Sequence, residues 1–287
     1  MNNFATWVRL VALSMAWGTA FLLIRIAVPS MGPSWLVELR VLIAGCLLLA
    51  WASWQRQPLR FREHAWLYIK LGALNSALPF VLVAWGEIAL PASLSAILIA
   101  TTPLFTALIV MFQSGGAPSW SRLLGMLAGL SGVIVLMGGL DQLGATPDYP
   151  AAVAATLLAA ASYAWAAVYT ARVGCGIPPL TLATGSQFGA ALILAILLPW
   201  VQVPSLPDVA VVMAILGLAA FSSAAAFLLY FRLIQDAGSV ATTTVNFLAP
   251  LFGVVGGHLC LEETLTQDFQ LGAACVLCGS YLVLRRR

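Results

Sequence analysis

The chain has 287 residues, of which 62% are hydrophobic and only 8% are charged. A soluble domain of this size carries roughly 25% charged residues, so the composition excludes a soluble globular protein. The formal net charge is +3, and the positions of the charges say more about function than their sum does.

Apolar runs long enough to cross a bilayer fill almost the whole chain. A helix that spans the hydrocarbon core needs about 20 apolar residues. Ten such runs, joined by short connections, predict transmembrane helices over residues 6–28, 33–53, 65–87, 91–112, 121–140, 150–172, 179–201, 207–231, 238–260 and 267–285. The first run is too long for the apolar core of a signal peptide and is kept as a helix. The expected fold class is therefore an all-α integral membrane protein with ten transmembrane helices.

The Lys and Arg residues predict the orientation of these helices, because loops rich in them stay in the cytoplasm. With a cytoplasmic N-terminus, eleven Lys or Arg residues fall at the inner side and only Arg25 at the outer side, while Arg40 lies within a span. The acidic residues lean toward the outer side. We therefore expect both termini in the cytoplasm.

The tripeptide Pro-Leu-Phe occurs twice, and Pro103 and Pro250 are 147 positions apart. The same offset pairs Phe80 with Phe227, Gly125 with Gly272, and Gly132 with Gly279. Each half holds five spans, an odd number, so the second half starts on the opposite side of the membrane. The pattern predicts two inverted five-helix repeats, 1–140 and 148–287, around a central cavity. Such an arrangement is typical of a carrier with access from both sides.

Polar and aromatic side chains recur at mid-depth in six of the spans. Trp and Tyr at this depth need polar partners for their N–H and O–H groups. Proline leaves a backbone carbonyl free, which a membrane tolerates only beside protein or a wet cavity. For each residue taken singly, packing or helix bending is the alternative. The candidate substrate-binding residues are Trp17, Asn75, Pro79, Thr102, Pro103, Ser162, Trp165, Tyr169, Ser222, Tyr230, Asn246 and Pro250.

The predicted mid-depth positions hold no Asp, Glu or His, which favours facilitated diffusion over ion coupling. Glu38 and Arg40 lie within a span, and a structural role is favoured for Arg40. Aromatic faces and hydroxyls suit a neutral, zwitterionic or modestly amphipathic small molecule, with an organic cation as the alternative. Cys275-x-x-Cys278 has a metal-like spacing but lacks a second pair, so packing is favoured. We expect no metal, no cofactor and no nucleic-acid partner.

The order of several short motifs resembles the ten-helix EamA-type carriers of the drug/metabolite transporter superfamily. The resemblance is carried by "AWGTAFLLIR" (16–25), "LR" (39–40), Pro-Leu-Phe (103–105), "FLAPLFGVVGGHLCLEETLT" (247–266) and "QLGAACVLCGSYLVL" (270–284). It implies alternating-access export of metabolites across a bacterial inner membrane, with a cavity lined by the first, third, fourth, sixth, eighth and ninth spans.

Within that family, the aromatic-rich centre is most similar to the YddG-type exporters, which implies aromatic and other neutral amino acids as substrates. An organic-cation or drug exporter with proton coupling is the alternative. An enzyme is not expected, because a nucleophile–base pair or a metal cluster would be needed and neither is apparent. The sequence leaves the oligomeric state open.

Overall fold

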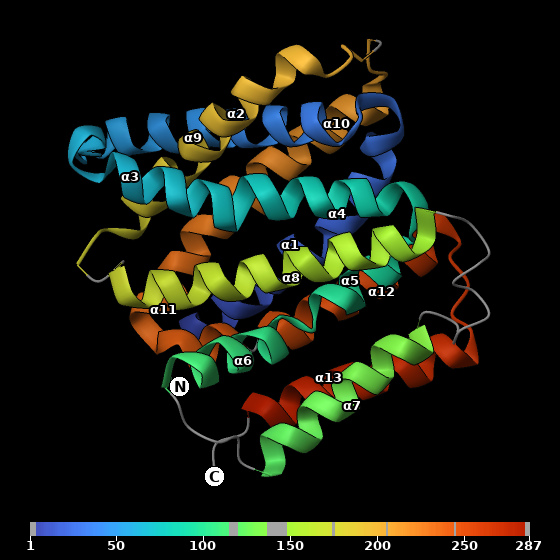
Figure 1. Ribbon diagram of the computed structural model, residues 1–287. Coiled ribbons are helices and arrows are strands. Elements are labelled where there is room, and N and C mark those ends of the chain that lie inside the picture. Colours follow the sequence, from blue (N-terminus) through green and yellow to red (C-terminus); the bar gives the residue numbers. More distant parts are fainter. Residues whose placement is uncertain are drawn as a thin grey trace.

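The computed structural model describes residues 4–114, 120–136, 148–173, 176–204, 206–243 and 245–284. Every regular element in these ranges is a helix, as Figure 1 shows. The first half comprises α1 (Phe4–Met31), α2 (Pro33–Trp54), α3 (Phe61–Gly72), η1 (Ala73–Ala77), α4 (Leu78–Ala89), α5 (Ala92–Ile99), α6 (Thr102–Ser114) and α7 (Trp120–Leu136). The second comprises α8 (Asp148–Val173), α9 (Pro179–Leu197), η3 (Leu198–Trp200), α10 (Val209–Gly217), η4 (Leu218–Ala225), α11 (Ala226–Thr243), α12 (Val245–Leu261) and α13 (Gln267–Leu284).

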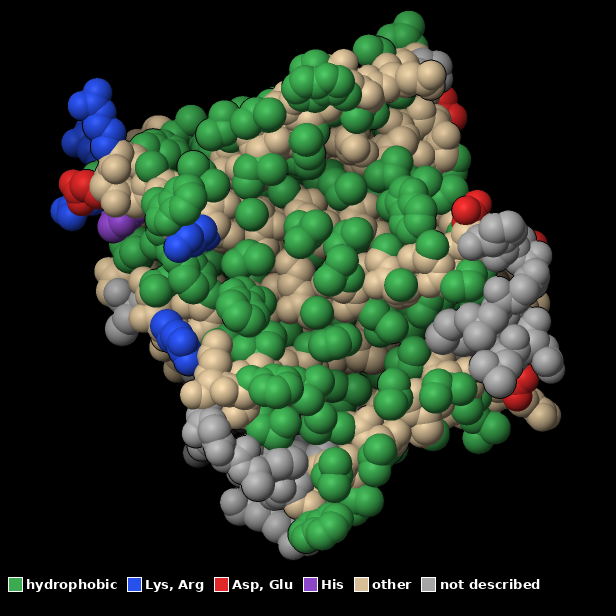
Figure 2. Space-filling view, viewed as in Figure 1, with side chains coloured by type: hydrophobic (Ala, Val, Ile, Leu, Met, Phe, Trp, Pro, Cys, Tyr) green, Lys and Arg blue, Asp and Glu red, His purple; other side chains and the backbone are tan. Residues whose placement is uncertain are grey.

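The helices are long and apolar enough for a multi-pass membrane protein. Seven candidate spans lie within the described ranges, together with the shorter apolar helices Leu123–Val135 and Leu248–Leu261. The space-filling view shows hydrophobic side chains across the visible face, with Lys and Arg at its left end and acidic side chains mainly at its right (Figure 2). An apolar belt between two charged ends is the surface that a bilayer requires.

Each of the ten predicted spans corresponds to a helix or to a stack of helical segments, but one boundary was predicted wrongly. The eighth span was expected to end at residue 231 and the ninth to begin at 238, whereas α11 continues to Thr243 and α12 starts at Val245. The eighth apolar run ends at residue 231, so residues 232–237 were expected to form a connection. Arg232 and Asp236 in this segment instead form an ion pair of 2.9 Å along the surface of α11, a spacing that supports a helix.

The two Pro-Leu-Phe sequences have different structures. Pro103 lies in the first turn of α6, directly after a break at residues 100–101, where a missing N–H is harmless. The carbonyl that it would have bonded, that of Ile99, accepts a 2.6 Å hydrogen bond from the Thr102 hydroxyl, so the expected free carbonyl is not found there. Pro250 is buried inside the continuous helix α12.

Two π-helical segments, η1 and η4, widen the third and eighth spans. At the offset of 147, residues 73–77 correspond to 220–224, which lie within η4. Leu74 lies in η1, and Pro79, in the first turn of α4, has no N–H group to donate to the Leu74 carbonyl. The hydroxyl of Ser162 donates to this carbonyl instead, at 2.7 Å. A wide turn thus occurs at equivalent places in the two halves, and such turns are frequent at functional sites.

The pair α7 and α13 packs side by side through glycines (Figure 1). A Cβ atom on Gly132 would lie 2.7 Å from the carbonyl oxygen of Gly272, and one on Gly279 would lie 2.5 Å from that of Gly125. The offset of 147 exchanges these two contacts, so they support a two-fold relation between the repeats. The repeat boundaries, 1–140 and 148–287, stay a prediction.

Candidate functional site

A cavity of about 530 Å³ lies between helices of both halves, within the usual range of small-molecule sites. All six spans predicted to line it contribute, and α2 adds one residue, Arg40. Its walls are formed by Trp17, Ala20, Phe21, Ile24, Arg40, Asn75, Phe80, Val83, Ala96, Ile99, Ala100, Thr102, Thr106, Val110, Gln113, Tyr163, Ala167, Val168, Ala171, Arg172, Phe227, Tyr230, Ile234, Thr242, Ala249 and Pro250.

A cluster of aromatic rings forms one part of the cavity wall. The ring centroids of Trp17 and Tyr230 are 5.3 Å apart, and those of Phe80 and Phe227 are 6.1 Å apart in an edge-to-face arrangement. The ring centroids of Tyr163 and Phe80, which both line the cavity, are 6.4 Å apart. Such contacts fix the rings in place and present a rigid apolar surface, which suits an aromatic or aliphatic group of a ligand.

Arg40 provides a positive charge to the same wall. Only 3% of its surface is exposed, and its guanidinium carbon lies 3.7 Å from the centroid of the Phe80 ring. Its Nε donates to the Ser223 hydroxyl at 2.7 Å, and its Nη2 donates to the Ser222 carbonyl at 3.3 Å. Both acceptors lie in η4, so the wide turn of the eighth span positions this side chain.

Five of the predicted site residues line the cavity, namely Trp17, Asn75, Thr102, Tyr230 and Pro250. Asn75 is 5% exposed, and its amide nitrogen has no hydrogen-bond partner in the described part of the chain. The hydroxyl of Thr102 donates to the Ile99 carbonyl at the end of the preceding helix, α5. Among the five, Asn75 therefore presents a buried polar atom that is free of hydrogen bonds to the described residues.

Among the remaining predicted residues, Pro79 lies in the first turn of α4, Ser162 donates to the Leu74 carbonyl of η1, and Pro103 lies in the first turn of α6. The hydroxyl of Ser222 donates to the Ala16 carbonyl at 2.6 Å. The hydroxyls of Ser162 and Ser222 thus join helices, and none of these four residues is in the lining of the cavity.

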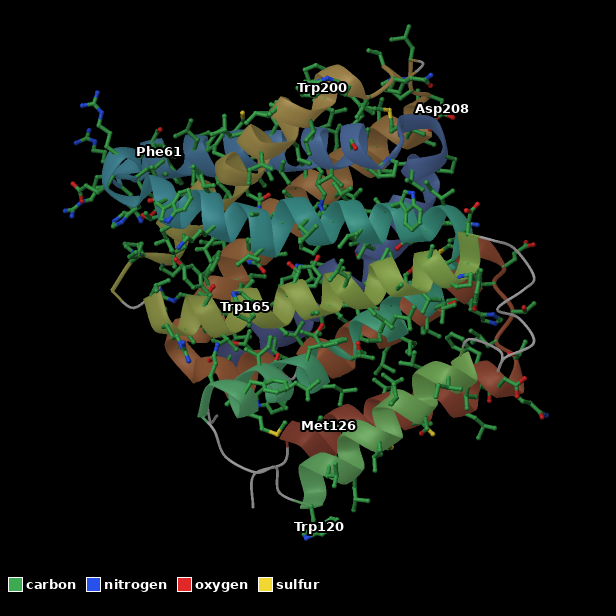
Figure 3. The ribbon with its side chains drawn as sticks, in the orientation of Figure 1. Phe61, Trp120, Met126, Trp165, Trp200 and Asp208 are labelled. Carbon is green, nitrogen blue, oxygen red and sulfur yellow. The ribbon has the colours of Figure 1, made fainter. Side chains whose placement is uncertain are left out.

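Trp165 and Tyr169 on α8 also lie outside the lining. Trp165 is 50% exposed on the outer face of that helix (Figure 3), and the ring of Tyr169 lies 5.6 Å from the amine of Lys70. Asn246 belongs to α12, but its side chain is outside the described residues.

Several lining residues were not in the predicted set, among them Arg40, Phe80, Tyr163 and Phe227. The sequence did contain a signal for two of them, because the offset of 147 pairs Phe80 with Phe227. Arg40 was interpreted as structural, and its place in the wall depends on η4, which the sequence did not predict.

The lining reaches the surface at one end only. Gln113 and Arg172 are exposed there, at the C-terminal ends of α6 and α8, and the Arg172 guanidinium donates to the Gln113 side chain. At the opposite end the lining stops at Ile24, Val83 and Ala96, which are all buried. The cavity is thus open toward the end that carries Arg172.

On the side of the opposite end, a carboxylate caps the start of α5. Glu263 accepts hydrogen bonds from the backbone N–H groups of Ala92 and Ser93 at 2.7 and 3.0 Å, which are otherwise unpaired at the start of α5. Glu262 has a left-handed φ of 56°, and this turns the chain back after α12. A Cβ atom on Gly257 would collide with the Glu263 carboxylate, so a larger residue there would displace the carboxylate from the start of α5.

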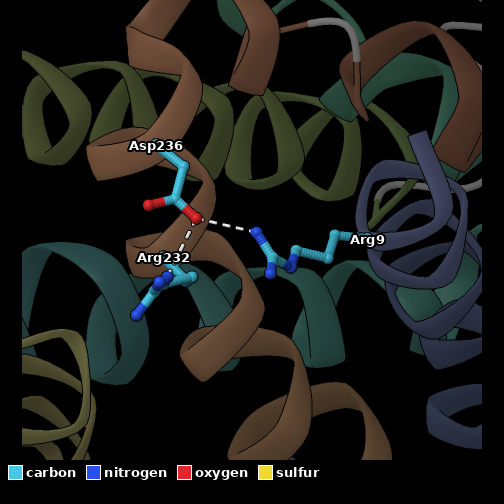
Figure 4. Close-up of polar contacts among 3 residues, drawn as sticks. All are labelled: Arg9, Arg232 and Asp236. Carbon is cyan, nitrogen blue, oxygen red and sulfur yellow. Dashed lines mark hydrogen bonds and ion pairs between the residues drawn. The ribbon is translucent and has the colours of Figure 1, made fainter. Parts of the chain in front are cut away.

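An ion pair joins α1 to α11 (Figure 4). Asp236 accepts from Arg9 at 2.7 Å and from Arg232 at 2.9 Å. The three side chains are between 32% and 55% exposed, so the pair contributes little to stability.

Two halves of similar construction around one cavity agree with the comparison to known families. The model of the EamA-like transporter family matches the chain twice, over residues 6–138 and 150–285. The chain belongs to this family. It is therefore a transporter of the drug/metabolite transporter superfamily and a multi-pass membrane protein.

Relatives of this EamA-like transporter are found in plants and bacteria. A WAT1-related chloroplastic protein of Arabidopsis thaliana is 30% identical, over 98% of this chain and 70% of its own length. YedA of Escherichia coli K12, described as an uncharacterized inner membrane transporter, is 28% identical over 96% of this chain and 89% of its own length. A crystal structure with 16% identity covers 98% of the chain with a TM-score of 0.71, which supports the fold alone.

Proposed function

We propose that this transporter exports small neutral or zwitterionic metabolites, above all aromatic and other amino acids, by alternating access and facilitated diffusion. The observation that carries the proposal is the cavity, which combines an aromatic wall with a few fixed polar groups. Rigid aromatic surfaces bind apolar side chains, and a small number of polar groups orients a ligand. The described lining residues include no Asp, Glu or His, the side chains that usually carry the proton in coupled transporters, and this favours facilitated diffusion.

The charge distribution supports export from the cytoplasm across a bacterial inner membrane. The cavity opens at the end of the bundle that holds Arg172, and the predicted orientation places this end and both termini in the cytoplasm. The capped end of α5, beside Glu263, then faces outward and is closed. This is the arrangement that an exporter adopts while it loads substrate.

Counterflow in proteoliposomes tests the proposal. Purified transporter is reconstituted with unlabelled phenylalanine inside, and uptake of labelled phenylalanine is followed without any ion gradient. We expect transient accumulation of label, since a facilitated carrier exchanges substrate in both directions. Glucose loaded in place of phenylalanine is the control and should give none. Failure of phenylalanine and of the other neutral amino acids to exchange would refute the proposal.

A second candidate is an organic-cation or drug exporter coupled to protons, and Glu87 favours it. This residue is completely buried, and neither carboxylate oxygen has a hydrogen-bond partner among the described residues. Buried ionisable groups in membrane helices are the usual proton carriers of coupled transporters. A pH gradient that drives uphill accumulation of a quaternary amine, with loss of that effect in Glu87→Gln, would favour this candidate over facilitated diffusion.

A further inference from the structure

Arg40 carries a buried charge that its structural contacts do not require. Two of its five guanidinium N–H groups are used, by Ser223 and by the backbone of Ser222. Among the described residues no carboxylate lies within ion-pair distance of it, and the buried Glu87 acts on it only over a longer range. Burying an unpaired charge within a membrane is costly, so the structural bonds alone do not explain why the residue is an arginine.

The other repeat shows how the same position is filled without a charge. The offset of 147 relates Arg40 to Gln187 and Ser223 to Ser76. The amide nitrogen of Gln187 donates to the Ser76 hydroxyl at 3.3 Å, which is the counterpart of the bond from Arg40 to Ser223. Gln187 is fully buried and does not line the cavity. A neutral side chain therefore suffices for this structural contact, and the charge is present in the repeat where the side chain reaches the cavity.

We infer that Arg40 binds the carboxylate of the transported molecule. The inference rests on the proposed function, because it specifies how an amino acid is held. The guanidinium has three further N–H groups, and its plane is fixed by η4 and by the Phe80 ring. A planar guanidinium can donate two parallel hydrogen bonds to a carboxylate.

The neighbouring groups fit the remainder of such a ligand. The free amide of Asn75 supplies one more polar contact, as donor or acceptor according to how the amide is turned. Trp17 and Tyr230 provide an aromatic surface for the side chain. The ligand class is thus a small carboxylate with an apolar or aromatic side chain. A cation without a carboxylate is disfavoured, because the Arg40 charge repels it.

Binding to the detergent-purified transporter, measured by isothermal titration calorimetry, tests this inference with three probes. L-Phenylalanine has both charges, L-phenylalaninamide lacks the carboxylate, and 3-phenylpropionate lacks the amine. We expect the wild type to bind phenylalanine about 10- to 100-fold more tightly than the amide, the range for hydrogen bonds to a charged partner. Arg40→Gln, which imitates Gln187, should abolish that preference, and Arg40→Lys should keep part of it. Gln187→Met removes the equivalent bond in the other repeat and should keep all of it.

The outcomes separate the two proposals. Equal binding of phenylalanine and its amide by the wild type, or an unchanged preference in a folded Arg40→Gln, overturns the role of Arg40 and leaves amino-acid transport standing. Binding of 3-phenylpropionate that depends on Arg40, without binding of any amino acid, supports Arg40 and refutes amino-acid transport. If neither carboxylate probe binds, both proposals fall. Thermal melting of each variant shows whether it is folded.

Discussion

Glu263 offers a sharp test of how the closed end of the bundle is held. Glu263→Gln removes the negative charge at the start of α5 while keeping an oxygen that can accept from Ala92 or Ser93. The carboxylate makes two charge-assisted bonds, of 2.7 and 3.0 Å. A charge at a helix N-terminus contributes about 0.3 to 2 kcal/mol, and hydrogen bonds to charged groups are stronger than neutral ones. We therefore expect the contact to weaken by about 1 to 2 kcal/mol, which is about 5- to 30-fold in its opening equilibrium.

Hydrogen exchange measured by mass spectrometry is the assay, on a peptide that begins several residues before Ala92 and includes Ser93. The amides of Ala92 and Ser93 depend on Glu263 for protection, so their exchange should accelerate by that factor. Glu262→Gln is the matched control, since it makes the same change of charge at an exposed neighbour. Unchanged exchange in Glu263→Gln, or equal acceleration in both variants, would show that the carboxylate does not hold the start of α5.

Three further predictions concern other parts of the molecule. Trp17→Ala should weaken phenylalanine binding about tenfold, because it removes an aromatic contact of the cavity. Trp165→Ala should leave the dissociation constant of phenylalanine, measured by calorimetric titration, within about twofold. The reverse order would contradict the placement of Trp17 in the cavity wall and of Trp165 outside it. Gly132→Leu should lower the melting temperature by several degrees, because even a Cβ would lie 2.7 Å from the Gly272 carbonyl; Gly256→Ala, whose Cβ would first meet Leu22 at 3.8 Å, is the control and should melt as the wild type does. Asp236→Asn should cost less than about 1 kcal/mol in thermal unfolding, since its partners are partly exposed, and a larger loss would mean that the ion pair holds α1 and α11 together.

The helical architecture could be predicted because hydrophobic length alone determines it in a membrane. The bias of Lys and Arg toward one side, which predicts the orientation, and the repeated Pro-Leu-Phe, which predicts two repeats, can likewise be read without tertiary information. The boundary between α11 and α12 was missed because the eighth span was ended with its apolar run at residue 231, although the helix continues through Arg232 and Asp236. Charged residues near a membrane surface are equally compatible with an extra helical turn, and here their i,i+4 pairing stabilises one.

The site residues were harder to predict because depth in the membrane does not specify the face of a helix. Trp165 and Ser162 are close in sequence at the same depth, yet one is exposed on the outside of α8 and the other bonds to the third span. Arg40 faces the cavity because η4 presents acceptors to it. A π-helical turn depends on which neighbouring side chains satisfy its backbone, and that information appears only once helices distant in sequence have packed together.

The two wide turns have a mechanical consequence for the pair of repeats. The turn in the first half is bonded through Ser162 to a helix of the second half, and the turn in the second half is bonded through Arg40 to a helix of the first. Twisting of either span therefore strains a bond to the other half. Under the proposed alternating access, halves that moved independently would at times open both ends of the cavity together and let solutes leak, and the two bonds would couple the movement of one half to that of the other.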